Sequence, residues 1–346
     1  MKVNSEIAKD KRQRFLCLKA PEDLARLLNL SNDDLLKMIS TPIYRSFYIP
    51  KKRTGSREIM APDKKLLQHQ SKIASFLNAV YNYRMPESVH GFISSEPNSK
   101  QETLHQKSKV RNIMSNASVH LNRKYVLNID LKDFFPSVSA TRVRKIFQDF
   151  PFYFEPEMAT CLALLCTYEK RLPTGSPTSP VLSNFACRAM DKKLYEYASQ
   201  NELRYSRYAD DLTFSSDEYF SDNTVQNIFK LIEEEGFTIN HEKFRIQSSF
   251  VKQTVTGIKV NKKLNLDRSF VRNLRAVFYD INKNGIDKAS VNYFGFEKVQ
   301  AGHQLIRSLI GKIQYLGQVR GKNDSLYLKY LTKVEVLQIL HENKLS

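Results

Sequence analysis

Three segments of the chain have the residue pattern of β-strands. In residues 124–131, large apolar side chains recur at every second position, so Asp130 should leave its strand on the opposite face. The segments 203–207 and 212–215 flank the sequence Tyr208-Ala-Asp-Asp211, which we expect to form a hairpin turn. The pattern therefore predicts strands that carry three aspartates at or near their ends.

Apolar residues at helical spacing occupy much of the remaining chain. Ala20–Ser40 has the pattern of two short helices, and Ser31 is the expected cap of the second. Further helices are predicted over residues 65–80, 140–149, 157–168 and 179–200. Residues 94–115 are polar and lack periodicity, so we interpret them as a surface insertion. Strands and helices in this order predict an α+β fold.

The composition changes after Leu266, where basic helices follow. Asp267 is the expected cap of the first one. Its arginines Arg268, Arg272 and Arg275 form one stripe, opposite the apolar residues Phe270, Leu274, Val277 and Phe278. Such a helix can pack through one face and present positive charge on the other, although a solvated stripe would look the same.

Positive charge dominates the composition, with 54 Lys and Arg against 36 Asp and Glu and a formal net charge of +18 over 346 residues. Unpaired charges are seldom buried, so the surplus should lie on the surface and favours a polyanionic partner. The sequence contains no apolar run of about 18 residues, signal segment or lipidation motif. We therefore expect a soluble, cytoplasmic protein that binds no membrane.

Asp210 and Asp211 are the strongest candidates for chemistry. Two carboxylates about 4 Å apart repel by roughly 4 kcal/mol at an effective dielectric constant of about 20, so they should bind a cation or shift their pKa. With Asp130 they supply the three carboxylates that suffice for two-metal phosphoryl transfer. A bare Asp-Asp pair is also common on solvated surfaces, and the surrounding motifs have to decide between these interpretations.

A basic hairpin is predicted upstream, where Tyr48 to Ile59 would fold about a turn at Thr54-Gly55. It carries Lys51, Lys52, Arg53 and Arg57, a set that suits a triphosphate but also occurs at ordinary solvated turns.

Four motifs follow this hairpin in order: Asp130-Leu-Lys-Asp-Phe-Phe-Pro-Ser137, Leu172-Pro-Thr-Gly-Ser-Pro-Thr-Ser-Pro180, Tyr208-Ala-Asp-Asp211 and Gly236-Phe-Thr-Ile-Asn-His-Glu-Lys243. Their succession resembles that of reverse transcriptases, roughly from Tyr48 to Val260. The sequences Asn116-Ala-Ser-Val-His120 and Val255-Thr-Gly257 enclose these four motifs and resemble paired markers of bacterial retron reverse transcriptases. Residues 309–316 are similar to the thumb helix of that family.

The resemblance implies a right-hand polymerase with fingers, a palm and a helical thumb. The expected divisions are an N-terminal helical segment over 1–45, fingers over 46–123 and a palm over 124–265. The palm would include fingers–palm helices within 140–200, and the thumb with its RNA-binding surface would occupy 266–346.

Catalytic roles are also implied by the resemblance. Asp130 and Asp210 would bridge two Mg²⁺ ions, with Asp211 close by and the Leu131 carbonyl as a further oxygen ligand. Lys243 resembles the lysine that donates a proton to the leaving group.

Nucleotide contacts are implied by the same resemblance. Lys51 and Arg57 resemble residues of the fingers that touch the triphosphate, and Lys52 would be the substitute for Lys51. Backbone amides of Asp133 and Phe134 match positions that cradle the same phosphates. Phe135 would place a ring against the sugar of the incoming nucleotide and exclude a 2′-hydroxyl.

The loop that contains Thr174 and Gly175 would approach the base pair and template. Many relatives carry Gln where Thr174 stands, so we expect altered fidelity. Ser179 is the expected cap of the following helix, and Pro180 its first residue.

RNA or primer contacts are expected at Asn116, His120, Tyr208, Val255, Thr256, Gly257, Arg268, Arg272 and Arg275. His120 has no Cys or second His at ligand spacing, so a zinc site is not expected there, and a structural or RNA-contact role is favoured.

The resemblance implies an RNA-directed DNA polymerase of a retron. Such an enzyme binds its cognate noncoding RNA (msr-msd), primes from the 2′-hydroxyl of a guanosine, and uses dNTPs to make branched RNA-linked DNA (msDNA). An effector protein of the same antiphage system is an expected partner. The alternatives are a group II intron or diversity-generating reverse transcriptase, and a noncatalytic RNA-binding scaffold that restrains an effector.

Overall fold

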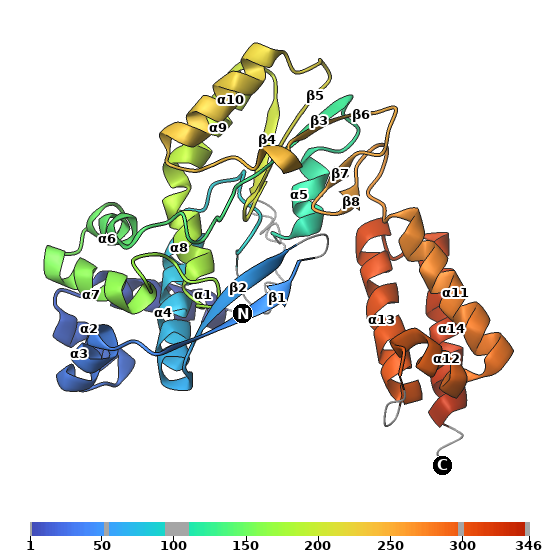
Figure 1. The fold of residues 1–346 in the computed structure, drawn as a ribbon, viewed down its shortest axis with the longest axis horizontal. Helices are drawn as coiled ribbons and strands as arrows, with labels where there is room; N and C mark the ends of the chain where they lie inside the picture. Colours follow the sequence, from blue (N-terminus) through green and yellow to red (C-terminus); the bar gives the residue numbers. More distant parts are fainter. Residues whose placement is uncertain (1, 52–54, 94–110, 297–300, 343–346) are drawn as a thin grey trace. The chain divides into compact units, whose positions relative to one another are not determined.

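The computed structural model describes residues 2–51, 55–93, 111–296 and 301–342 (Figure 1). Its contacts divide the chain into two compact units. Unit 1 comprises residues 1–119 and 124–246, and unit 2 comprises residues 120–123 and 247–346. Among the helices in the described ranges, none is long and apolar enough to cross a membrane. The finer division into fingers, palm and thumb stays a prediction.

The central sheet has the strand order β4-β5-β3-β6. Its strands are β3 (Tyr125–Asp130), β4 (Arg204–Tyr208), β5 (Asp211–Ser216) and β6 (Arg245–Ser248). β5 pairs antiparallel with both β3 and β4. The three strands predicted from the sequence are confirmed to within two residues. Leu127 and Ile129 are buried in the core of unit 1, as their alternation predicts.

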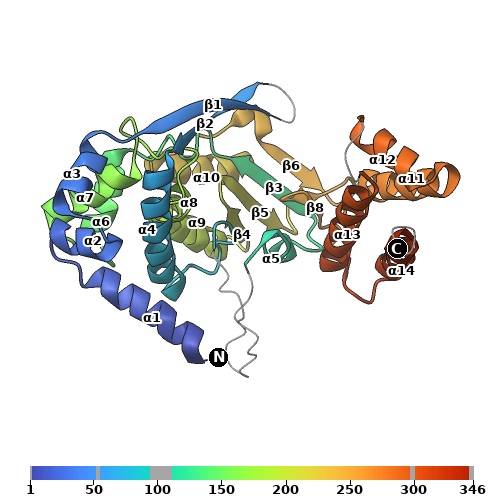
Figure 2. The ribbon, with the colours of Figure 1, turned by 90° about the horizontal axis from the view of Figure 1, so that it is seen from below.

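The helices of unit 1 are α1 (Lys2–Leu16), α2 (Pro21–Leu28), α3 (Asn32–Ser40), α4 (Lys64–Tyr83), α5 (Ile113–Val119), α6 (Ala140–Gln148), α7 (Pro156–Cys166), α8 (Ser179–Ala186), α9 (Arg188–Gln200) and α10 (Asp222–Glu234). Of these, α5 and α9 contact strand β4, while α1, α2, α3, α6 and α7 lie farther from the sheet (Figure 2). The Ser31 hydroxyl accepts a hydrogen bond from the Asp34 amide, so this predicted cap is confirmed.

Three details of the helix prediction are wrong. Residues 179–200 form two helices that meet at Cys187, the C-cap of α8 and the N-cap of α9. Helix α8 is buried on nearly every face, whereas α9 buries one face. Thr178 is the N-cap residue of α8, and the Ser179 hydroxyl instead donates to the carbonyl of Pro173. The end of the expected 94–115 insertion belongs to α5, while residues 94–110 lie outside the described part of the chain.

The basic hairpin consists of β1 (Tyr44–Pro50) and β2 (Ser56–Pro62), paired antiparallel from Tyr44 opposite Pro62 to Pro50 opposite Ser56. Its predicted strands are therefore confirmed. Lys52, Arg53 and Thr54 lie outside the described residues.

Unit 2 joins a short hairpin to helices. The hairpin consists of β7 (Thr254–Val255) and β8 (Ile258–Lys259), and its turn residues have φ values of 47° at Thr256 and 82° at Gly257. Positive φ at both positions is typical of the tight turn that joins two twisted strands. The helices are α11 (Arg268–Asn284), α12 (Ile286–Phe294), α13 (Ala301–Arg320) and α14 (Ser325–Glu342).

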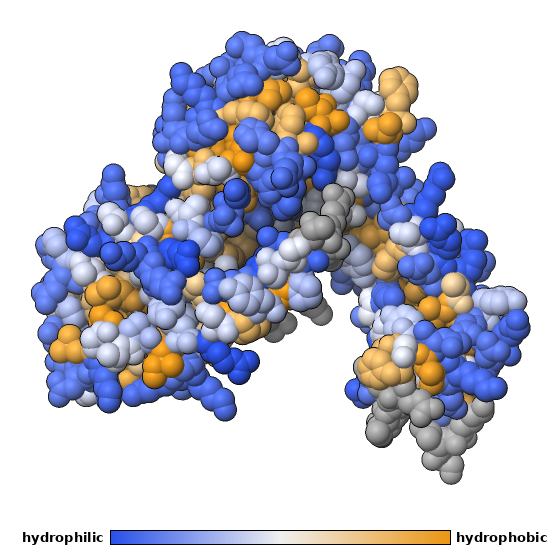
Figure 3. All heavy atoms as spheres, in the orientation of Figure 1, coloured by the Kyte–Doolittle hydropathy of each residue, from blue (hydrophilic) through white to orange (hydrophobic). Residues whose placement is uncertain are grey.

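The amphipathic pattern of α11 is confirmed. Asp267 caps this helix by accepting from the Ser269 amide, and Leu274 and Phe278 are buried. Arg268, Arg272 and Arg275 are exposed. Hydrophilic residues cover most of the visible face of each unit, with apolar residues in smaller groups (Figure 3).

Candidate active site

Asp130, Asp210 and Asp211 lie together at one end of the central sheet. Asp130 on β3 stands directly opposite Asp211 on β5 in the antiparallel register. The amide of Leu131 donates to the carbonyl of Asp210 at 3.0 Å, which ties the end of β3 to the turn between β4 and β5. The structure thus brings Asp130 together with two adjacent aspartates that follow it 80 residues later in the sequence.

Ala209 and Asp210 form the two-residue turn that joins Tyr208 to Asp211. Ala209 has a φ of 57°, in the left-handed region that costs an L-residue about 1–2 kcal/mol. The neighbouring residue Gly91 approaches this turn so closely that a Cβ there would lie 2.4 Å from the Ala209 nitrogen. A side chain at position 91 would displace this turn, so only glycine fits there.

The aspartates repel one another electrostatically. The pKa of Asp211 is raised to about 6, first because the surrounding protein limits its hydration and then because Asp210 and Asp130 are close. The pKa of Asp210 is raised for the same reasons, and the charges of Lys243 and Arg57 oppose the increase. Asp211 retains exposed surface, so water screens part of this repulsion. Crowded carboxylates with this property are suited to a cation.

Lys243 contacts the most buried of the three aspartates. Its Nζ donates to both carboxylate oxygens of Asp130 at 2.9 Å, and the Asn240 side-chain amide donates to Asp130 Oδ2 at 3.2 Å. Lys243 closes the short 3₁₀ helix His241–Lys243, which follows directly after Asn240. Asp130 itself is 8% exposed. The predicted catalytic lysine is therefore adjacent to the carboxylates.

The donor set fits a hard divalent cation, because carboxylate and carbonyl oxygens are its preferred ligands. Within residues 2–51, 55–93, 111–296 and 301–342, no group of three acidic, histidine or cysteine side chains is arranged closely enough to hold a metal. The Lys243 ammonium group contacts both carboxylate oxygens of Asp130. A metal held by Asp130 would have to compete with this ammonium group for the same oxygens.

A buried ion pair supports the turn at Ala209-Asp210, and the sequence analysis did not identify it. Arg207 on β4 forms two hydrogen bonds to Asp191 on α9, at 2.8 and 2.7 Å, with exposures of 0% and 1%. Arg207 Nη1 also donates to the carbonyl of Ala209 at 3.0 Å and to Asn184 Oδ1 at 3.1 Å. Asn184 in turn donates to the Gly91 carbonyl at 3.0 Å. The sequence contains only one indication of this ion pair, a charged residue, Arg207, within a predicted strand.

The expected nucleotide-binding residues differ in their surroundings. Arg57 is close enough to Asp210 to lower its pKa, and Lys51 is exposed at the end of β1. Phe134 is buried and stacks with Phe237, whereas Phe135 is half-buried. The ring of Phe135 lies 5.7 Å from that of Phe92 and 5.6 Å from that of Phe134. Asp133, with a φ of 47°, is exposed.

Thr174 and Gly175 pack against strand β2. The Thr174 hydroxyl donates to the Glu58 carbonyl at 2.7 Å and accepts from the Met60 amide at 3.2 Å. A Cβ at Gly175 would lie 2.6 Å from the Met60 carbonyl oxygen. These residues therefore join the loop to the basic hairpin, a structural role that the sequence analysis missed.

Three of the expected RNA contacts are not at the surface. Asn116, His120 and Val255 are each 0% exposed, so their side chains have no surface with which to touch RNA. Asn116 instead accepts a hydrogen bond from Ser206 on β4 at 2.7 Å. Their burial favours the structural role that the sequence left open for His120, and a contact of these residues with RNA stays a prediction.

The other predicted RNA contacts remain accessible. Tyr208 and Thr256 are half-buried, and Gly257 is exposed like the three arginines of α11.

Comparison with known proteins finds similarity over most of the chain. Residues 49–298 match the family described as reverse transcriptase (RNA-dependent DNA polymerase). The retron Mx65 reverse transcriptase of Myxococcus xanthus is 33% identical over 255 residues, which cover 68% of this chain and 55% of that protein. The retron Ec86 reverse transcriptase of Escherichia coli is 34% identical over 175 residues, or 50% of this chain and 54% of that protein.

The retron Mx162 reverse transcriptase of Myxococcus xanthus is 29% identical over 307 residues, which cover 77% of this chain and 59% of that protein. The chain thus spans less than two thirds of the length of each of these three relatives. A solved structure of telomerase from Candida albicans has a TM-score of 0.45 and 13% identity, over 88% of this chain and 61% of that one, a likeness too low to support an argument.

Proposed function

Because the chain belongs to the reverse transcriptase family and its relatives are retron enzymes, we propose that it is an RNA-directed DNA polymerase of a retron. It binds a cognate noncoding RNA, primes from the 2′-hydroxyl of a guanosine, and synthesises branched RNA-linked DNA. The observation that carries this proposal is the convergence of Asp130, Asp210 and Asp211 at the end of the sheet.

Asp130, Asp210, Asp211 and the Leu131 carbonyl would hold two Mg²⁺ ions, which supply positive charge to the attacking hydroxyl, the triphosphate and the leaving pyrophosphate. The chain itself positions these groups. Register across β3 and β5 fixes two of the carboxylates relative to each other, and Arg207 holds the turn that carries Asp210.

Lys243 is the proposed proton donor. Its flexible ammonium group is already next to Asp130, and it is 55% exposed, so it can leave the carboxylate without leaving the site. The Lys243 ammonium group would protonate the pyrophosphate oxygen as this group leaves.

Nucleotide selection is proposed for residues on either side of the aspartates. Lys51 and Arg57 would contact the triphosphate from the hairpin, and the amides of Asp133 and Phe134 would contact it from the end of β3. The ring of Phe135 packs against the rings of Phe92 and Phe134, so it has little freedom to move aside for a 2′-hydroxyl.

RNA binding is proposed for the exposed arginines of α11 in unit 2. Each phosphate they neutralise releases counterions, so capture of the RNA should weaken steeply with salt. Shape and unpaired bases of the RNA, rather than charge, should determine its identity.

The test is the nucleic acid that the protein makes in cells. The chain is expressed with its flanking DNA and purified, and the copurified nucleic acid is sequenced before and after ribonuclease and debranching treatment. We expect single-stranded DNA joined to a small RNA through a 2′ linkage. Asp210→Asn should retain the RNA and contain no DNA, while Asp222→Asn, a change of an exposed aspartate on α10, should behave as the unchanged protein.

Two results would contradict the proposal. Recovery of only unlinked RNA from the unchanged protein would favour a noncatalytic scaffold. DNA with an unbranched 5′ end would favour an intron-type or diversity-generating enzyme.

An effector protein is proposed as a partner of the RNA–DNA complex, and its presence would be checked by comparing phage plating with and without the neighbouring genes.

A further inference from the structure

Unit 1 carries a second concentration of functional chemistry outside the candidate active site. Three arginines and three aromatic residues form what we call the arginine–aromatic cluster, which consists of Arg12, Tyr83, Arg84, Phe150, Tyr153 and Arg188. They come from α1, the C-terminal end of α4, the connection between α6 and α7, and the start of α9. None of them is among the candidate catalytic or nucleotide-binding residues.

Cation–π contacts link the cluster into a continuous series. The Arg12 guanidinium lies 3.6 Å from the centroid of the Tyr83 ring, and Arg84 lies 5.8 Å from the same centroid. Arg84 and Arg188 both contact the Phe150 ring, at 5.4 and 5.1 Å. The cluster ends at Tyr153, whose ring meets Phe150 edge-on at 6.1 Å.

The aromatic members are unusually exposed for their size. Tyr83 is 61% exposed, Tyr153 is 70% exposed and Phe150 is 42% exposed. Exposed aromatic rings that stand next to one another on a surface indicate a binding site more often than isolated ones do. A guanidinium covers part of a ring, and the remaining ring surface is open to a ligand.

The arginines have no acidic partners in the part of the chain that the structure describes: no ion pair is found for Arg12, Arg84 or Arg188. Arg188 donates only to the Phe150 carbonyl, at 3.4 Å. Burial and the neighbouring charge of Arg84 lower the pKa of Arg188. Two guanidinium groups held beside one ring without a carboxylate leave several N–H donors for an external anion.

From this arrangement we infer that the arginine–aromatic cluster binds single-stranded nucleic acid, with arginines on the phosphates and unpaired bases stacked on Tyr83 and Tyr153. Arginine forks match phosphate oxygens, and base–aromatic stacking tolerates any sequence. A duplex fits poorly, since its bases are already stacked on each other. The net charge of +18 favours a polyanion over other ligands with aromatic groups.

The site is separate from the hairpin proposed to contact the triphosphate. Figure 2 shows the β1–β2 hairpin along one side of unit 1 and α1 along the other. A strand bound to the cluster would therefore be held by the polymerase outside the region that carries the hairpin. The inference goes beyond the proposed function, because it concerns binding and does not require branched DNA synthesis.

The experiment measures binding of a labelled oligonucleotide of about 12 unpaired nucleotides, as RNA and as DNA, to the full chain. An excess of unlabelled hairpin duplex with a primer end occupies the polymerase site. Arg12→Gln with Arg84→Gln should weaken binding about 10-fold or more, and should reduce the slope of log K against log salt by about 1.4, or about 0.7 for each lost phosphate contact. Tyr83→Leu with Tyr153→Leu should weaken binding while leaving the slope unchanged.

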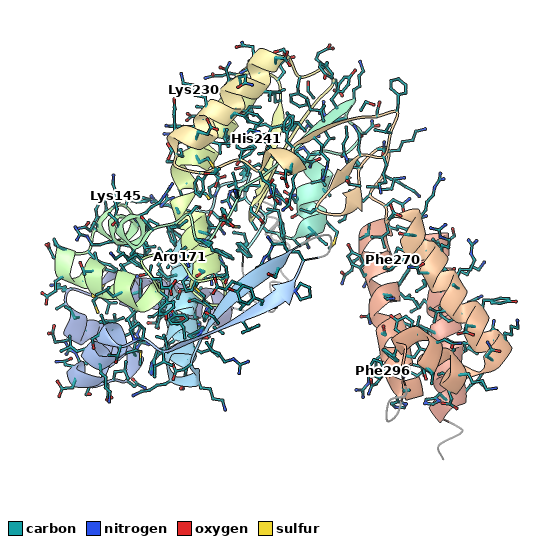
Figure 4. All side chains as sticks on the ribbon, viewed as in Figure 1. Lys145, Arg171, Lys230, His241, Phe270 and Phe296 are labelled. Carbon is teal, nitrogen blue, oxygen red and sulfur yellow. The ribbon has the colours of Figure 1, made fainter. Side chains whose placement is uncertain are left out.

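The matched control removes the same charge elsewhere. Lys145 on α6 and Lys230 on α10 are exposed and labelled in Figure 4, and Lys145→Gln with Lys230→Gln should change binding less than about 2-fold. Photocrosslinking with 4-thiouridine or 5-iodouracil oligonucleotides should label the peptides that contain Tyr83 or Tyr153. Primer extension on an oligonucleotide template should be unaffected by the Arg12 and Arg84 changes.

Several outcomes would overturn the inference. Equally weakened oligonucleotide binding in the control variant would show that the loss of binding depends only on net charge. Crosslinks elsewhere, with none at the cluster, would place the strand on another surface. Effective competition by a blunt duplex, added beyond the hairpin duplex that occupies the polymerase site, would exclude stacking of unpaired bases. Competition by poly-glutamate at equal charge concentration would indicate an acidic protein as the ligand instead.

Discussion

The Arg207 guanidinium donates a hydrogen bond to the carbonyl of Ala209, the residue directly before Asp210. The same guanidinium is fixed by two hydrogen bonds to Asp191, so the position of the turn at Ala209-Asp210 depends on a buried ion pair. Burial alone would lower the pKa of Arg207, yet Asp191 and other neighbours hold it well above its ordinary value. Arg207 is therefore charged at any pH at which the protein folds.

Arg207→Lys should keep the charge beside Asp191 but lose the fork that also reaches Ala209. We expect the rate of nucleotide incorporation to fall about 10-fold or more, equivalent to about 1.4 kcal/mol in the barrier, with little change in KM for dNTP. Arg207→Met should lower the free energy of unfolding by about 3–5 kcal/mol, since it leaves Asp191 buried and unpaired.

A suitable control is Arg142→Lys, because Arg142 donates to the carbonyls of Glu235 and Ala186 and does not touch the turn. It should affect stability without the loss of rate. Equal loss of rate in both lysine variants would indicate that Arg207 acts on folding alone.

Asp211 should make stability depend on pH in the metal-free protein. Its pKa is raised from 3.8 to about 6, so the folded state binds a proton more tightly than the unfolded chain. The free energy of unfolding should therefore fall as the pH rises through this interval and stay lower above it. Asp211→Asn should abolish this pH-dependent loss of stability. In EDTA at about pH 8, the variant should have a higher melting temperature than the unchanged protein, and the difference should narrow below about pH 4. A variant less stable than the unchanged protein at about pH 8 would contradict the assignment.

Lys243→Gln should have two separable effects. Removing the ammonium group from Asp130 should lower the Mg²⁺ concentration needed for half-maximal activity, because a competing cation is lost. The maximal rate should fall by about 10²- to 10⁴-fold if Lys243 is the proton donor. Lys243→Arg restores the charge but cannot give up a proton at neutral pH, so it should recover the Mg²⁺ dependence and not the rate. An unchanged maximal rate in the Gln variant would exclude the proton-donor role.

Phe135→Val should relax discrimination against ribonucleotides. The smaller side chain removes the ring that Phe92 and Phe134 brace, and we expect the preference for dNTP over rNTP to fall by about 10- to 100-fold. Single-nucleotide incorporation with matched dGTP and rGTP measures this ratio. Phe147→Val, at a buried ring in the same unit, should destabilise the fold without changing the ratio.

Two glycine substitutions should change stability in opposite directions. Gly175→Ala places a Cβ 2.6 Å from the Met60 carbonyl oxygen and should lower the free energy of unfolding by about 1–3 kcal/mol. Gly311→Ala lies within α13, where a Cβ has nothing within 4 Å, and should raise the free energy of unfolding by about 0.5–1 kcal/mol. Chemical denaturation of both variants, followed by circular dichroism, measures the difference. If Gly175→Ala is as stable as the unchanged protein, the loop at Gly175 does not pack tightly against β2.

Local signals explain the parts that were correctly predicted from the sequence. Ser31 and Asp267 cap helices within three residues of themselves, and the turn at Thr256-Gly257 needs only its own two residues to adopt positive φ. Alternation along residues 124–131 gives both a strand and the face of that strand that enters the core. These features depend on neighbours in the chain, which a sequence displays directly.

Features that depend on distant residues required the tertiary structure. Nothing near Gly91 indicates that it must lie against Ala209, and nothing near Thr174 indicates that its hydroxyl binds strand β2. Asn116, His120 and Val255 belong to recognisable motifs, yet their burial is decided by segments that pack over them.

The sequence by itself determined the candidates for chemistry: three aspartates, a lysine and the order of motifs in which they occur. Only the tertiary structure decided which groups hold those side chains in place, because the pairing of Arg207 with Asp191 and of Lys243 with Asp130 joins residues 16 and 113 positions apart. Contacts across such separations arise when helices and strands pack, and no local pattern of residues specifies them.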